Sequence, residues 1–290
     1  MEMTVFRIGA AVAAIALAAV TAGPAWASVD HTLVVHFDLA QHQQPENITL
    51  EPDGSADLTF SQAKQVARVS RDGRTTILAQ LPGGVAGIVR TADGTLYVNV
   101  NAGAQTGVYQ LRDGQTRLFA PLPAGFVNGL ALDGSTLYAT DSSAGQVWRI
   151  PLRTGKAVVW AQGGPLAKVS GFGSNGIKAH AGAVWVSNTD TGVLLRIPVR
   201  PDGSAGPIQT RATGLAGIDD FTFDGPTVLA AINSASQLAV IHPDGSHTIA
   251  LTAADGLSNP TSIAVRGKSV YVASAAYRTQ LDPNLLITRF

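Results

Sequence analysis

Hydrophobic and polar residues alternate with a period of two along most of the chain, and the alternating segments recur in similar groups. Each group contains short apolar strands separated by polar turns, often with Asp-Gly or Thr-Gly at a hairpin. Three groups align directly: LYVNVNAGAQTGVYQLRDGQT, LYATDSSAGQVWRIPLRTGKA and VWVSNTDTGVLLRIPVRPDGS. No stretch between them shows the 3.6-residue period of a helix. The pattern therefore predicts an all-β protein built from a repeated unit.

The strand that opens each unit defines a common register. The residue two places before its first apolar residue occurs six times, at Glu46, Ala86, Asn128, Asn175, Asp219 and Thr261. Successive positions are 40, 42, 47, 44 and 42 residues apart. This spacing is typical of the four-stranded blades of a β-propeller. A β-solenoid needs a shorter repeat, and a single β-sandwich would not explain six units.

The two ends of the chain complement each other. The sixth unit ends one strand short, whereas the segment HTLVVHFDL at residues 31–39 precedes the first unit and belongs to none. Pairing this segment with residues 285–290 would complete the last blade and remove two exposed sheet edges. The predicted fold is a six-bladed β-propeller closed by an N-terminal strand in blade six.

The first 27 residues have the pattern of a secretory signal peptide. Arg7 precedes an apolar run over residues 8–20, and Ala25-Trp26-Ala27 is a small-x-small cleavage site. Residues 28–290 are then a single mature propeller domain, and we expect the protein to be secreted, to the periplasm or beyond the cell. No other segment approaches the roughly 18 apolar residues of a membrane span.

Composition narrows the classes of partner. The net charge is zero and Lys and Arg form no cluster, so nucleic acid and anionic membranes are not expected as partners. Cysteine is absent, which excludes disulfides, thiolate catalysis and cysteine-type zinc sites. We expect a monomer that binds a small molecule.

Candidate chemistry lies in the common register, because the first strand of every blade lines the central channel. Four of its six positions carry side-chain oxygens suited to a hard cation: Glu46, Asn128, Asn175 and Asp219. Thr261 could assist, and Ala86 leaves a gap. Two carboxylates and two amides on separate blades suit calcium or another divalent cation. Each position alone has an ordinary alternative, since Asn-Gly at a strand boundary is most often a turn.

The stretch GFGSNG at residues 171–176 also spells the G-x-G-x-x-G dinucleotide fingerprint. That fingerprint requires a helix after the glycines, and the following IKAHAGAVWVSN alternates like a pair of strands. We therefore interpret Asn175 as opening the inner strand of blade four, with the glycines letting backbone pass close to the channel.

The units ENITL, VNGLALDGSTLYATD, SNGIKAHAGAVWVSNTD and GIDDFTFDGPTVLAA resemble the SMP-30/gluconolactonase/LRE family of six-bladed propellers, which includes strictosidine-synthase-like relatives. The resemblance implies that Glu46, Asn175 and Asp219 hold a calcium ion and that Asn128 contacts the substrate. Asp219 would also be the catalytic base. Asp220 follows it where the family usually has glycine, and it either competes for this role or contacts substrate.

The resemblance implies a calcium-dependent hydrolase of lactones or related cyclic esters, and the signal-peptide pattern predicts that this hydrolase is secreted. Many gluconolactonases carry an arginine shortly before the blade-three asparagine, but here Phe126 and Val127 occupy that approach. Two other functions stay open: a non-catalytic propeller that binds a ligand or partner, and a non-hydrolytic biosynthetic enzyme of the strictosidine-synthase-like type. The aromatic residues Phe126 and Phe172 near the expected channel mouth are compatible with the latter.

Overall fold

The structure is a computed structural model that describes Met1 and residues 30–289. The predicted signal peptide therefore lies, apart from Met1, outside the described residues. No helix in the described part of the chain is long and apolar enough to cross a membrane. Its helices are single 3₁₀ turns in loops: η1 (Leu39–Gln41), η2 (Gly103–Gln105), η3 (Gly164–Leu166), η4 (Asn233–Ala235) and η5 (Ala253–Asp255).

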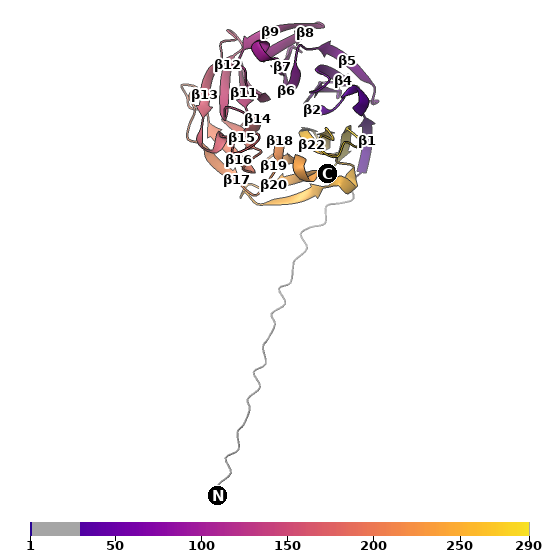
Figure 1. Cartoon of the computed structure of the whole chain (residues 1–290), viewed down its shortest axis with the longest axis vertical. Helices are drawn as coiled ribbons and strands as arrows, with labels where there is room; N and C mark the ends of the chain where they lie inside the picture. Colours follow the sequence, from indigo (N-terminus) through magenta and orange to yellow (C-terminus); the bar gives the residue numbers. More distant parts are fainter. Residues whose placement is uncertain (2–29, 290) are drawn as a thin grey trace.

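The chain forms six four-stranded antiparallel sheets. Figure 1 shows them arranged as a ring around a central axis, which is the channel axis of the propeller. The strands of each blade are given from the channel outward. Blade one contains β2 (Pro45–Leu50), β3 (Ala56–Phe60), β4 (Gln65–Val69) and β5 (Thr75–Gln80), and blade two contains β6 (Gly84–Arg90), β7 (Leu96–Asn101), β8 (Gly107–Arg112) and β9 (Gln115–Pro121). Blade three contains β10 (Val127–Asp133), β11 (Thr136–Asp141), β12 (Gln146–Pro151) and β13 (Val158–Gln162). Blade four contains β14 (Ser174–His180), β15 (Ala183–Asn188), β16 (Val193–Pro198) and β17 (Gln209–Ala212), and blade five contains β18 (Ile218–Asp224), β19 (Thr227–Ile232), β20 (Gln237–Ile241) and β21 (His247–Leu251). Blade six contains β22 (Pro260–Arg266), β23 (Ser269–Ser274), β24 (Asn284–Arg289) and, as its outermost strand, β1 (Asp30–His36). The six-bladed all-β propeller predicted from the repeat is confirmed.

Blade six combines the two ends of the described chain. Strand β1 runs antiparallel to β24, with Asp30 opposite Arg289 and His36 opposite Asn284. Its outer position leaves β22 at the channel, like the first strand of every other blade.

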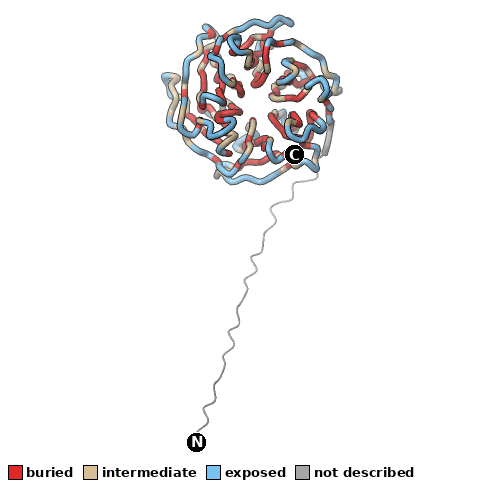
Figure 2. Tube along the Cα trace, viewed as in Figure 1, coloured by how far each residue is buried: buried red, intermediate tan, exposed pale blue. Residues whose placement is uncertain are grey.

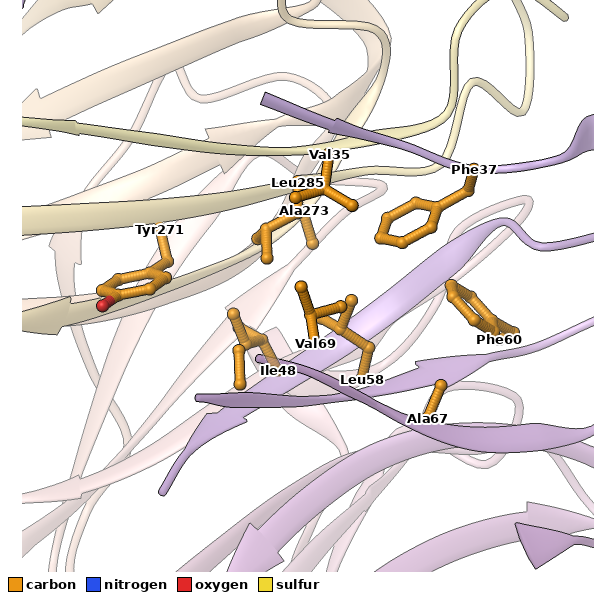
Figure 3. Close-up of a cluster of buried hydrophobic side chains, with 11 residues drawn as sticks. Val35, Phe37, Ile48, Leu58, Phe60, Ala67, Val69, Tyr271, Ala273 and Leu285 are labelled. Carbon is orange, nitrogen blue, oxygen red and sulfur yellow. The ribbon is translucent and has the colours of Figure 1, made fainter. Parts of the chain in front are cut away.

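The core consists of apolar layers between neighbouring blades, which explains the alternation in the sequence. Figure 3 shows the layer between blades six and one, where Val35 of β1 and Phe37 after it meet side chains from both blades. The rings of Phe37 and Phe60 pack edge to face at 5.0 Å. Figure 2 shows buried segments gathered toward the inside of the ring and exposed segments around its rim. The N-terminal strand therefore joins the inter-blade core as well as the sheet.

Each inner strand is irregular where the common register falls. The pairing of β10 with β11 skips from Val127 to Leu130, and the pairing of β14 with β15 skips from Ser174 to Ile177. Such bulges redirect side chains, and here they free Asn128 and Asn175 from the alternation of the strand. A Cβ on Gly129, the second residue of its bulge, would lie 2.5 Å from the carbonyl oxygen of Asn175. Glycine is required there because adjacent inner strands approach so closely.

Candidate functional site

A cavity of about 440 Å³ opens at the channel mouth where the inner strands begin. All four oxygen-bearing residues predicted from the register line it: Glu46, Asn128, Asn175 and Asp219. The other two register positions do not. Ala86 is buried without a polar side chain, and the hydroxyl of Thr261 donates to the carbonyl oxygen of Pro45 at 2.9 Å. The common register thus places four side chains from four blades at one site.

The backbones of Asn128, Asn175 and Asp219 are each held by the second strand of the preceding blade. The Asn99 side-chain amide donates to the carbonyl oxygen of Asn128 at 2.8 Å. The hydroxyls of Thr140 and Ser187 donate in the same way, at 2.5 Å, to the carbonyl oxygens of Asn175 and Asp219, respectively. These bonds link blades two to five in succession and hold the bulges in place.

Two further hydroxyls orient the amide of Asn175 and that of Asn128. The Thr189 hydroxyl donates to the carbonyl oxygen of Ile218 at 2.7 Å, so its lone pair accepts from Nδ2 of Asn175 at 2.9 Å. The Ser142 hydroxyl donates to a backbone carbonyl at 2.7 Å and accepts from Nδ2 of Asn128 at 3.2 Å. Because each amide nitrogen faces its hydroxyl, the two Oδ1 atoms are left to accept from a ligand or to bind a cation.

The two carboxylates of the cavity have strongly perturbed acidity. Burial raises the pKa of Glu46 to about 7, with repulsion from Asp220 adding to it and a hydrogen bond from Tyr277 opposing it. Burial, followed by repulsion from Glu46 and Asp220, raises the pKa of Asp219 well above its ordinary value. Among the described residues neither carboxylate has a lysine or arginine partner. A bound cation or a retained proton would therefore stabilise this pair.

Tyr277 is a site residue that the sequence analysis missed. Its hydroxyl lies 2.5 Å from Oε2 of Glu46 and donates to it, and its ring lines the cavity. Burial and the neighbouring Glu46 raise the pKa of Tyr277 well above 10, so the hydroxyl stays protonated and remains a donor. Tyr277 lies in the loop between β23 and β24, outside the repeated register. Its sequence signal is only an aromatic residue with a polar end in an unusually long loop of blade six.

Asp220 lies outside the cavity lining, in the channel interior, whereas Asp219 faces the cavity. Both Asp220 oxygens accept from Nζ of Lys178, at 2.7 and 2.6 Å. The Ser262 hydroxyl and Nδ2 of Asn47 also donate to it, at 2.7 and 3.1 Å. The residue after the register position is glycine in blades two to four, whereas in blade five it is a carboxylate paired with Lys178. The contact of Asp220 with a substrate stays a prediction.

Asn101 and Asp141, the last residues of β7 and β11, bond to neighbouring backbone groups. Asn101 accepts from the backbone nitrogen of Val127 and donates to its carbonyl oxygen, both at 2.9 Å. Asp141 accepts from the backbone nitrogens of Ser143 and Ala144 at 3.1 and 3.0 Å. These side chains fix the loops at the channel mouth and do not line the cavity.

The donor set of the cavity fits a hard divalent cation. Two carboxylates and two amide oxygens converge, and neither histidine nor cysteine lines the cavity, which favours calcium over zinc. Within residues 30–289 no three His, Cys, Asp or Glu side chains are grouped to hold a metal ion. A cation here must therefore rely on the amide oxygens of Asn128 and Asn175 together with the carboxylates.

Several solved propellers are similar to this chain. A gluconolactonase from Xanthomonas campestris is 16% identical with a TM-score of 0.69, covering 92% of this chain and 98% of its own. The calcium-binding protein regucalcin from Agrobacterium tumefaciens is 17% identical with a TM-score of 0.67, covering 85% and 90%. Virginiamycin B lyase from Staphylococcus aureus is 14% identical with a TM-score of 0.63, covering 89% and 99%. At these identities the similarity shows the shared fold alone.

A search among curated protein sequences finds no match to the chain. The predicted resemblance to the SMP-30/gluconolactonase/LRE family is thus supported at the level of the propeller fold, by structural neighbours of that kind. The family model that matches the sequence is a different one and covers residues 48–253, well over half of the chain. The protein belongs to the family described as a repeat of unknown function, DUF6923.

Proposed function

We propose that this propeller is a hydrolase of lactones or related cyclic esters and that it depends on calcium or another divalent cation. One observation carries the proposal: the partly buried carboxylates of Glu46 and Asp219 share a cavity with two free amide oxygens and have no lysine or arginine partner among the described residues. Gluconolactonase and regucalcin, which share the fold, support it.

Glu46, Asn175 and Asp219 would hold the cation, and Asn128 would contact the substrate. When bound, the cation supplies Lewis-acid polarisation of the ester carbonyl. Asp219 accepts a proton from the attacking water. The cation beside it would keep its carboxylate ionised near neutral pH. The water oxygen bonds to the carbonyl carbon, the ring C–O bond breaks, and the proton passes to the leaving alkoxide. The product is the open hydroxy acid.

The supporting residues prepare this geometry before substrate arrives. Tyr277 donates to Glu46 and fixes the direction of its carboxylate. Thr189 binds the amide nitrogen of Asn175 and so turns Oδ1 the other way. Preorganisation of this kind removes the cost of arranging the site during the reaction.

The test is turnover of a lactone panel by residues 28–290, with calcium and with a chelator. Asp219→Asn should lower kcat by about a hundredfold or more, because it removes the general base. Asp224→Asn, an exposed carboxylate at the other end of β18, is the matched control and should leave turnover unchanged. Calcium binding with no turnover on any ester would contradict the proposal and favour a binding propeller.

We also propose that the chain is exported and cleaved after Ala27. The support is the Arg7, apolar run and Ala25-Trp26-Ala27 pattern. Mass spectrometry of the secreted protein should find Ser28 at the N-terminus, and recovery of uncleaved chain from the cytoplasm would contradict export.

A further inference from the structure

The wall of the cavity between blades three and four is aromatic, although the rest of the site is polar. Phe126 precedes β10 and Phe172 precedes β14, and both line the cavity. Their rings lie 5.0 Å apart between centroids, with an angle of 57° between the planes. The Phe172 side chain is 46% exposed, so its apolar surface is available from the cavity mouth.

Phe172 is held at this position by Asp190, which follows β15. The Asp190 carboxylate accepts from four consecutive backbone nitrogens, those of Val169 and Ser170 at 2.8 Å, Gly171 at 2.9 Å and Phe172 at 3.2 Å. The Asp190 nitrogen donates back to the carbonyl oxygen of Phe172 at 3.0 Å. An exposed phenyl ring on a loop tied by five hydrogen bonds is a prearranged surface.

Phe126 is held by the loop between β11 and β12 of blade three, which corresponds to the loop of blade four that contains Asp190. Its backbone nitrogen donates to the Ser143 hydroxyl at 2.9 Å, and its carbonyl oxygen accepts from the Ser142 nitrogen at 2.9 Å. Two adjacent blades therefore present one phenyl ring each to the same wall. Neither backbone can swing its ring away without breaking these bonds.

We infer that Phe126 and Phe172 form an apolar subsite for a hydrocarbon or aromatic substituent of the substrate, and that Asp190 is its positioning residue. The inference rests on the proposed function and names its substrate class: lactones with an alkyl or aryl side chain, in preference to sugar lactones. A polyhydroxylated ring would have to bury hydroxyl groups against the phenyl rings without partners, which is unfavourable. An alkyl or aryl side chain would instead be transferred from water to this apolar wall. Each buried methylene group would then raise the affinity by about fourfold.

Binding of non-hydrolysable analogues tests the subsite separately from turnover. δ-Valerolactams with methyl, butyl or hexyl side chains, and gluconolactam, are titrated into residues 28–290 with calcium. We expect affinity to rise by about two- to fourfold per methylene group in the wild type and gluconolactam to bind more weakly than the butyl compound. Affinity independent of side-chain length, or a preference for gluconolactam, would overturn the inference.

The variants are chosen to separate the subsite from the rest of the cavity. Phe172→Ala should flatten the chain-length dependence and leave the affinity for the methyl compound within about twofold, because the lost surface is apolar. Val169→Ala changes a side chain of the same loop that is 77% exposed and outside the cavity lining, so it should keep the wild-type dependence. Equal losses for all three lactams in Phe172→Ala would contradict the assignment.

Asp190→Asn tests the positioning role, since an amide replaces one of the two accepting oxygens with a donor. It should flatten the chain-length dependence as Phe172→Ala does, while the affinity for the methyl compound stays close to wild type. A wild-type chain-length dependence in Asp190→Asn would refute the role. If the lactams bind as expected but no lactone is hydrolysed, the proposed function fails and the subsite stands.

Discussion

Glu46 has a pKa of about 7, so its charge changes within the range of physiological pH. An unfolded glutamate loses its proton near pH 4.5, whereas the folded chain retains it to about pH 7. Between these values the folded state binds more protons, so stability falls as pH rises. A shift of this size corresponds to at most about 3 kcal/mol, and to less where the carboxylate borders an open cavity.

We therefore predict that the calcium-free protein melts at a higher temperature at pH 5 than at pH 8, and that Glu46→Gln reduces this difference. Calorimetric melting of both proteins across that range measures the effect. The difference between them isolates Glu46 from the other titrating groups. A melting difference that is the same in wild type and Glu46→Gln would contradict the assigned pKa.

Tyr277 acts on the same carboxylate in the opposite sense, because its hydrogen bond lowers the pKa of Glu46. Tyr277→Phe removes only the hydroxyl, so the pKa of Glu46 should rise further. We predict that the acidic limb of the rate against pH moves to higher pH, with turnover most reduced near pH 6 and least affected near pH 8.5. Uniform loss of turnover at every pH would show that Tyr277 has another role.

At the scale of the element, the bulge of each inner strand determines where a site residue points. Gly176 follows Asn175 in the bulge of β14, and a Cβ there would lie 2.6 Å from Cα of Asp220. Gly176→Ala should therefore shift the strand, lower the unfolding free energy by about 1–3 kcal/mol and weaken calcium binding. Gly84→Ala is the control for stability, since its nearest neighbour lies 3.6 Å away and its φ is not positive. Chemical denaturation of the two variants decides the point, and equal stability of both would contradict the account.

The repeated inner strands explain why much of the site could be predicted from the sequence. Each blade begins with the same register, so Glu46, Asn128, Asn175 and Asp219 converge once the blades close into a ring. Which of Asp219 and Asp220 faces the cavity could not be predicted, because the bulge between Ile218 and Phe221 suspends the alternation.

Tyr277 was beyond prediction for a different reason. It belongs to a loop that is not repeated, and it meets Glu46 across 231 positions of sequence. That contact arises only because blade six closes against blade one. The hydroxyl groups of Thr140 and Ser187 could not be assigned from the sequence for the same reason. The residues around them do not indicate that each hydroxyl bonds to the backbone of the next blade.

At the scale of the whole molecule, Asp220 links blades across the channel. Its carboxylate in blade five meets Lys178 of blade four, Asn47 of blade one and Ser262 of blade six. Asp220→Ala leaves a partly buried lysine without its partner and should lower the unfolding free energy by about 3 kcal/mol. The double variant Lys178→Met with Asp220→Ala should recover part of this loss. Denaturation of the singles and the double gives the interaction energy, and additive effects would show that the pair does not hold the ring together.

The ring brings residues from separate blades to one cavity. The central claim is that this cavity binds a divalent cation. Calorimetric titration of calcium into chelator-treated residues 28–290 tests it most directly, with Asn175→Ala as the site variant and Asp224→Asn as the control. We predict one calcium per chain in wild type and in Asp224→Asn, and an affinity lower by about tenfold or more in Asn175→Ala. Absence of calcium binding in the wild type, or an affinity unchanged by Asn175→Ala, would contradict the account.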